Sequence, residues 1–104
     1  MAQGFSLATA TAETFQPLVD SDFGVRPDDS SEDAGQLTLA GVHLSNTPGA
    51  GKRNPFSLFF KGRADFPLGQ GTYFLNHATL GTFPLFIVPI ADDATTREYQ
   101  AVFS

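Results

Sequence analysis

Short stretches in which apolar and polar residues alternate, separated by turn-forming residues, recur along this chain. In one of them, NPFSLFFKG, Phe56, Leu58 and Phe60 fall on one side of an extended backbone, and Ser57 and Lys61 fall on the other. A period of two is typical of half-buried β-strands. Comparable strands are predicted near residues 23–26, 36–45, 72–77, 82–90 and 99–104. We therefore expect a mainly β fold, a small antiparallel barrel or sandwich of about six strands.

Glycine interrupts the pattern of the second predicted strand. Its apolar positions shift phase at Gly41, between Leu39 and Val42. A glycine at a phase shift indicates a β-bulge or a bend, because the extra residue turns the following side chains to the other face.

Proline interrupts the strand at 82–90. Pro84 and Pro89 have no N–H to donate to a neighbouring strand, so this strand is predicted to lie at a sheet edge or to be bulged at those points. The link through Leu80 and Gly81 is short, which favours a hairpin with the strand at 72–77.

One short helical turn is predicted over residues 12–16. Thr11 can act as its N-cap, Glu13 suits the first turn, and Pro17 is expected to end it. An isolated helix of this length is unstable in water. We therefore expect its apolar residues to pack on one end of the sheet as a lid; they are Phe15, Leu18 and Val19.

Length and composition indicate one domain, residues 1–104. Cysteine is absent, which excludes disulfides, thiolate metal sites and a cysteine nucleophile. The first residues lack the pattern of a signal peptide and no apolar run is long enough to span a bilayer, so we expect a cytoplasmic protein without membrane contact. The net charge of −5 argues against nucleic acid as a partner, although four cations are closely spaced: Lys52, Arg53, Lys61 and Arg63.

Two loops resemble ion or phosphate motifs without meeting them. In the acidic stretch DSDFGVRPDDSSEDAG, Asp20 and Asp22 have the spacing of a calcium loop, but Gly24 stands where the third ligand belongs. In NTPGAGKRNP, Arg53 replaces the Ser or Thr of a phosphate-binding loop, and Asn46 replaces its first glycine. We interpret the first as an exposed acidic loop and expect no nucleotide site in the second.

The two histidines give no metal signature. A zinc or hydrolytic site would need His43 and His77 together with a carboxylate such as Asp65 or Asp93, and no ligand spacing indicates this. Both histidines are therefore interpreted as structural or half-exposed, and His77 is expected to cap a turn. Whether the two rings meet in space stays open, and no metal or cofactor is expected.

Residues with catalytic chemistry also lack context. Ser57 lies in the middle of a predicted strand and not on the strained turn of a nucleophile elbow. The pairs Asp28–Asp29 and Asp92–Asp93 are adjacent in polar turns, whereas acid–base catalysis needs separate carboxylates that converge in a cleft. We expect no catalytic residue and no enzymatic activity.

Four segments together resemble a known family: ETFQPLVDSDFGV, NPFSLFFKG, PLGQGTYFLNHATLG with FPLFIVPI, and YQAVFS. The chain is similar, over nearly its whole length, to a bacterial family of roughly hundred-residue domains of unknown function. It departs from the family pattern at three turn or strand positions, where Asp20 replaces Gly, Lys61 replaces Arg and Ala78 replaces Pro. The resemblance implies no catalytic residue. Its association with phage-tail-like gene neighbourhoods implies an accessory structural or assembly role.

Two functions from different classes remain. The first is a non-catalytic interaction module that binds a protein partner or self-associates into a homo-oligomer. The second is a small-ligand-binding β-barrel, which would need an unfilled interior, whereas so many phenylalanines are expected to fill it. The interface candidate is Phe59, which faces outward between Ser57 and Lys61. It is expected to lie under the helical turn around Phe15, or at a contact with another chain.

Overall fold

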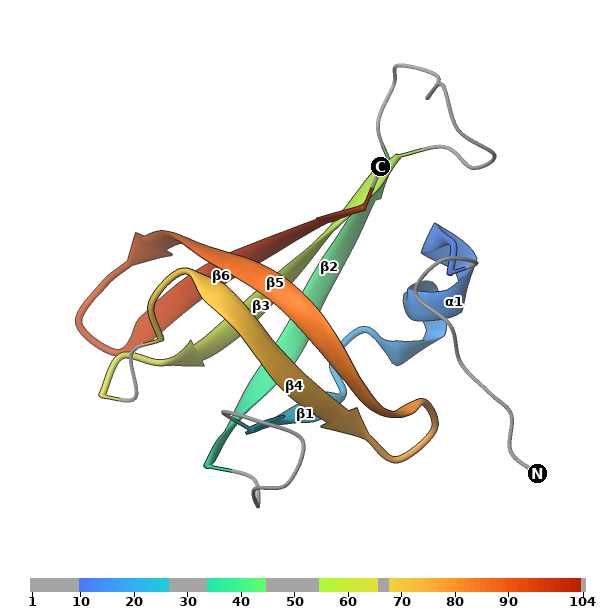
Figure 1. The fold of residues 1–104 in the computed structure, drawn as a ribbon. Coiled ribbons are helices and arrows are strands. Elements are labelled where there is room, and N and C mark those ends of the chain that lie inside the picture. Colours follow the sequence, from blue (N-terminus) through green and yellow to red (C-terminus); the bar gives the residue numbers. More distant parts are fainter. Residues whose placement is uncertain (1–9, 27–33, 45–54, 66–67, 104) are drawn as a thin grey trace.

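The computed structural model describes residues 10–26, 34–44, 55–65 and 68–103, which form a closed antiparallel barrel (Figure 1). Its strands follow the order β1-β2-β3-β6-β5-β4 around the barrel. The strands are β1 (Asp22–Arg26), β2 (Gly35–Leu44), β3 (Phe56–Arg63), β4 (Gly71–His77), β5 (Gly81–Asp92) and β6 (Thr96–Phe103). The prediction of a mainly β fold is confirmed. Of the two predicted architectures, barrel and sandwich, the barrel is correct.

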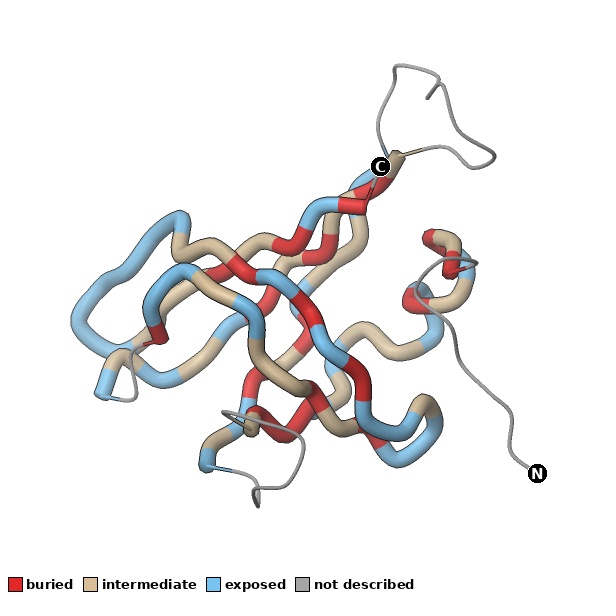
Figure 2. The backbone as a smooth tube through the Cα atoms, viewed as in Figure 1, coloured by how far each residue is buried: buried red, intermediate tan, exposed pale blue. Residues whose placement is uncertain are grey.

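The longer strands of the barrel alternate between interior and exterior, as their sequences indicate, whereas β1 has three buried residues in a row. Figure 2 shows buried and exposed residues taking turns along β5. The interior is filled mainly by aromatic and aliphatic side chains, of which the largest fully buried ones are Tyr99, Phe15, Phe23, Phe56, Phe60, Leu37, Leu39, Leu58, Leu75 and Ile87. At the inward position of Gly62 a Cβ would lie 2.6 Å from a methyl carbon of Leu37, so a larger residue there would require Leu37 to move.

Both strands that were predicted to be irregular, β2 and β5, contain a bulge, but β5 is not an edge strand. The register between β2 and β3 shifts between Leu39 and Gly41, which confirms the bulge. The register between β5 and β6 shifts between Pro89 and Ala91, which confirms a bulge at the second proline. The bulge predicted at Pro84 is wrong, because Pro84 pairs with Phe74 of β4 in an unbroken register. The alternative of an edge strand is wrong, because the closed barrel places β5 between β4 and β6.

The helical turn closes one end of the barrel. Helix α1 (Ala12–Phe15) passes directly into a 3-10 turn, η1 (Gln16–Leu18). Pro17 therefore ends the α-helix but not the helical segment, since a proline is tolerated in the first turn, where its missing N–H has no partner. Phe15 is completely buried, and Leu18 and Val19 pack against the core from its rim, so the predicted lid is confirmed.

Candidate functional site

Phe59 is on the outer surface of the barrel, and the helical turn does not cover it. It is half-buried and lies between Gly41 of β2 and Gln100 of β6. The ring of Phe15 instead contacts interior rings, at centroid distances of 6.0 Å from Phe56 and 5.6 Å from Phe103. The expectation that the helical turn covers Phe59 is wrong, because that turn closes the end of the barrel from the inner side of β3.

Apolar side chains are also exposed on the outer surfaces of β6 and β5, the strands that follow β3 around the barrel. Val102 of β6 is 68% exposed, and Phe86 of β5 is 50% exposed. Val88 is half-buried and lies directly across from Gln100, the residue that also pairs with Phe59. We call these four residues the outer apolar patch: Phe59, Phe86, Val88 and Val102.

The sequence of β5 contains a signal for this patch. In FPLFIVPI the inward residues of β5 are apolar, and so are the outward ones, Pro84, Phe86 and Val88. A strand that is apolar on both faces is typical of sheets covered on both sides. Here only the inner face of β5 is covered by the chain itself.

His77 lies inside the barrel wall and is held through both ring nitrogens. Its Nδ1 accepts a hydrogen bond from the N–H of Thr79 at 3.0 Å, so the predicted turn cap is confirmed. Its Nε2 lies 3.0 Å from the hydroxyl of Ser21, which in turn donates to the carbonyl oxygen of Leu18. Because Nδ1 accepts, the proton of the neutral ring resides on Nε2. The ring packs on Phe23 at 4.5 Å, and burial lowers the pKa of His77.

The histidines and carboxylates considered for a metal site are not brought together. His43 is exposed near the end of β2, across from Ser57, whereas His77 is buried against Phe23. Asp65 forms an ion pair with Arg63. Within the described ranges, no three histidine or acidic side chains form a group that could hold a metal ion.

The carboxylate of Asp93 organises the turn between β5 and β6. It accepts hydrogen bonds from the N–H groups of Thr95 and Thr96, at 2.9 Å and 2.8 Å. These bonds lower the pKa of Asp93, and the positive charge of Lys61 adds to the effect. Asp92, its neighbour, lies 3.5 Å from Arg97. This pair of acids therefore shapes a turn, in agreement with the interpretation from the sequence.

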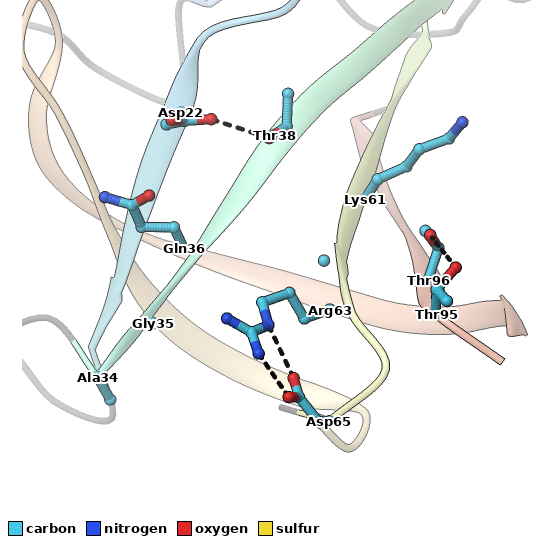
Figure 3. A pocket seen from close by; sticks show the side chains of 11 residues that line it. Asp22, Ala34, Gly35, Gln36, Thr38, Lys61, Arg63, Asp65, Thr95 and Thr96 are labelled. Atoms are coloured by element: carbon cyan, nitrogen blue, oxygen red, sulfur yellow. Dashed lines mark hydrogen bonds and ion pairs between the residues drawn. The ribbon is translucent and has the colours of Figure 1, made fainter. Parts of the chain in front are cut away.

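A polar groove of about 780 Å³ lies on the outer face of β1, β2 and β3 (Figure 3). Its side chains come from alternate strand positions and from two turns, and they include Asp22, Gln36, Thr38, Lys61, Arg63 and Asp65. Several of them already have partners inside the groove. Thr38 donates its hydroxyl to Asp22 at 2.8 Å, and Arg63 binds both oxygens of Asp65 at 2.9 Å and 2.6 Å.

The charges of this groove are largely neutralised by their neighbours. The hydrogen bonds from Arg63 lower the pKa of Asp65, which stays a carboxylate beside the guanidinium. Lys61 lies close enough to Asp93 to affect its pKa. Arg63 is already paired with Asp65 and offers little to an added anion, so the groove is a weak candidate for an anion site.

Two of the sequence motifs lie outside the residues that the structure describes. They are the phosphate-loop-like segment with Asn46, Lys52 and Arg53, and the pair Asp28–Asp29 of the acidic stretch. The calcium-like positions at the start of that stretch are described: Asp20 precedes β1, and Asp22 and Gly24 are part of β1.

Comparison with protein-family models matches residues 10–103 to a domain of unknown function, DUF6916. This match confirms the resemblance to an uncharacterised domain family of about the length of the chain. No curated protein and no solved structure matches the chain. Among the described residues, no helix is long and apolar enough to cross a membrane.

Proposed function

Because the chain belongs to the family DUF6916, whose function is unknown, we propose a function from its surface: it is a non-catalytic interaction module that binds a protein chain through the outer apolar patch. The observation that carries this proposal is the exposure of Phe86 and Val102, at 50% and 68%, on neighbouring strands. Exposed apolar side chains interspersed with polar ones are typical of an interaction surface.

The energetics of the patch favour binding over exposure to water. Burying a Val or Phe side chain completely stabilises a protein or a complex by about 1.5 to 3 kcal/mol. Aromatic side chains bury a large apolar area and contribute strongly to binding where a contact covers them. Phe59 and Phe86 have this character, and the polar side chains of Ser57 and Gln100 lie between them, hydrogen-bonded to each other at 3.2 Å.

An accessory role in a larger structural assembly suits such a module. The family resemblance supports this context through its association with phage-tail-like gene neighbourhoods. A small barrel with one binding face can join other subunits without any reactive group. Asp93 and His77 agree with such a role, because both accept hydrogen bonds that stabilise turns.

The second candidate, a barrel that binds a small ligand in its interior, has less support. Interior rings contact each other throughout the barrel: Phe56 stacks on Phe103 at 4.6 Å, and Phe23 meets Phe60 edge-on at 5.5 Å. A ligand would have to displace these contacts. Protein interiors packed in this way have little free volume for a guest molecule.

Affinity purification from the native host tests the proposed function. We expect the wild-type chain to retain a defined protein and the variant V102D to lose it, because a carboxylate would be buried in the contact. The matched control Q36D places the same charge on the exposed outer face of β2, away from the patch, and should retain the protein. Equal retention by V102D and the wild type would contradict the proposal.

A further inference from the structure

The polar groove on β1, β2 and β3 is large enough for a small organic molecule (Figure 3). Its volume of about 780 Å³ lies within the range of pockets that hold such ligands. Three of its lining residues have no side chain larger than a methyl group: Ala34, Gly35 and Gly62. A ligand can therefore lie close to the sheet, between the longer side chains of the groove.

Two pairs of side chains in the groove orient each other, and each pair leaves one group without a hydrogen bond. Thr38 donates to Oδ1 of Asp22 at 2.8 Å. Nε and Nη2 of Arg63 donate to Asp65 at 2.9 Å and 2.6 Å. Among the described residues, nothing bonds to Oδ2 of Asp22, to Nη1 of Arg63 or to the side-chain amide of Gln36. The groove thus offers an oriented acceptor, an oriented donor and an amide that can do both.

The formal charges of the groove cancel. Its described lining residues include two cations, Lys61 and Arg63, and two anions, Asp22 and Asp65. A site that binds a strongly charged ligand normally has a surplus of the opposite charge. Neither an anion nor a cation is therefore favoured here, although Nη1 of Arg63 is still a good hydrogen-bond donor.

Other classes of ligand also fit the groove poorly. An apolar ligand would find no aromatic or large aliphatic side chain among the described lining residues. A peptide strand would find no free edge, because Thr38 of β2 already pairs with Asp22 of β1 and Lys61 of β3. A metal ion would find no group of three histidine or acidic side chains in the described ranges.

A neutral molecule that is rich in hydroxyl groups meets these conditions. Each hydroxyl both donates and accepts a hydrogen bond and has no charge. Asp22 and Arg63 lie on the two strands that flank β2, whose backbones are about 10 Å apart. This span suits a chain of sugar rings better than a single ring.

We propose that the polar groove is a binding site for a short neutral carbohydrate. In this complex one sugar hydroxyl accepts from Nη1 of Arg63, another donates to Oδ2 of Asp22, and Gln36 bonds the ring between them. The site is additional to the proposed protein contact and does not depend on it.

Titration of the isotope-labelled protein with three neutral trisaccharides, followed by NMR, tests this site. The probes are maltotriose, cellotriose and triacetylchitotriose. We expect at least one of them to shift the amide signals of Gln36, Thr38 and Lys61, with a dissociation constant of about 1 mM, because each hydrogen bond to the sugar replaces one to water. Q36A and R63A should each weaken this binding by about fivefold.

The matched control is Q70A, since Gln70 is also exposed but lies in the turn before β4, outside the groove. It should bind the sugar as the wild type does. Thermal unfolding of Q36A and R63A shows whether each variant is folded, and Q36A alone suffices if R63A is not.

Three results would overturn the carbohydrate site. The first is the absence of shifts with all three sugars at about 10 mM. The second is a response of the groove signals only to inorganic phosphate or to a blocked alanine tripeptide, which would identify an anion or a peptide site. The third is equal weakening by Q36A and Q70A, which would place the sugar elsewhere. None of these results bears on the host protein that the outer apolar patch is proposed to bind.

Discussion

His77 joins two parts of the chain through its ring nitrogens, the turn at Thr79 and the segment with Ser21 that precedes β1. Protonation of Nδ1 would remove the hydrogen bond from the N–H of Thr79 and would place a cation against Phe23. Burial therefore lowers the pKa of His77 below the ordinary value of 6.5. The unfolded chain takes up a proton near pH 6.5 that the folded chain does not, so the free energy of unfolding decreases as the pH falls below that value.

Urea denaturation at several pH values checks this expectation. We expect the wild type to be most stable above about pH 6.5 and to lose stability toward pH 5, and H77Q to lack most of this dependence. H77Q should also be less stable at pH 7.5 by about 1 to 2 kcal/mol, because hydrogen bonds of Ser21 and Thr79 are changed. H43Q is the matched control, since His43 is exposed. An unchanged pH dependence in H77Q would show that other groups cause it.

Asp20 has a backbone conformation that favours glycine. Its φ is 76°, in the left-handed region, and its N–H donates to the carbonyl oxygen of Leu39 at 2.7 Å. This conformation is unfavourable by about 1 to 2 kcal/mol for most residues, somewhat less for Asp. We expect D20G to raise the free energy of unfolding, by up to about 1 kcal/mol, and D20A to lower it.

Thermal and urea unfolding of D20G and D20A measures this effect. D22G is the control, because Asp22 is also exposed but lies in β1 and accepts a hydrogen bond from Thr38. D22G should therefore destabilise the barrel. A D20G variant that is no more stable than the wild type would mean that the side chain of Asp20 compensates for its φ. The family resemblance, in which glycine is frequent at this position, agrees with the backbone geometry.

At the scale of elements, the side chain of Phe15 anchors α1 and η1 to the end of the barrel. Phe15 is completely buried and contacts Phe56 and Phe103 at the end of the barrel. We expect F15A to lower the free energy of unfolding by about 3 to 5 kcal/mol. E13A, on the exposed side of α1, should change it by less than about 0.5 kcal/mol. Denaturation curves of the two variants measure these changes. Similar free energies of unfolding for both variants would contradict the role of α1 as a lid.

Local sequence patterns predicted elements better than contacts between elements. Alternation placed the strands, Gly41 marked the bulge, and Thr11 and Pro17 framed the α-helix, because each feature depends on neighbours in the sequence. Contacts such as Phe15 with Phe103 depend on how the barrel closes. Periodicity does not contain this information, so the cover predicted for Phe59 was wrong.

The residues of the candidate site show the same difference between contacts that are local in the sequence and contacts between distant segments. The turn cap of His77 joins residues close in the sequence and was predicted, whereas its contact with Ser21 crosses most of the chain and was not. The outward direction of Phe59 follows from alternation alone. Its association with Val88 and Val102 requires the order of β3, β6 and β5, and two prolines in β5 indicated an edge strand instead.

At the scale of the whole molecule, β6 holds the barrel together. It pairs with β3 from Phe56–Phe103 to Arg63–Thr96 and with β5 on its other side. We expect a chain that ends at Thr95 not to fold, because β3 and β5 then both lose a neighbour and Tyr99 is missing from the core. Adding a synthetic peptide of residues 96–103 should restore the β-sheet signal in circular dichroism. A scrambled peptide is the control, and folding without any peptide would contradict the role of β6.

The place of β6 also has a consequence for synthesis on the ribosome. The hairpin of β4 and β5 can form early, because its two strands follow each other directly. Strand β6 then has to enter between β3 and β5, so the barrel cannot close until Phe103 has left the exit tunnel. Until then the nascent chain exposes both apolar faces of β5. The order of the strands therefore makes closure of the barrel a late step that waits for β6.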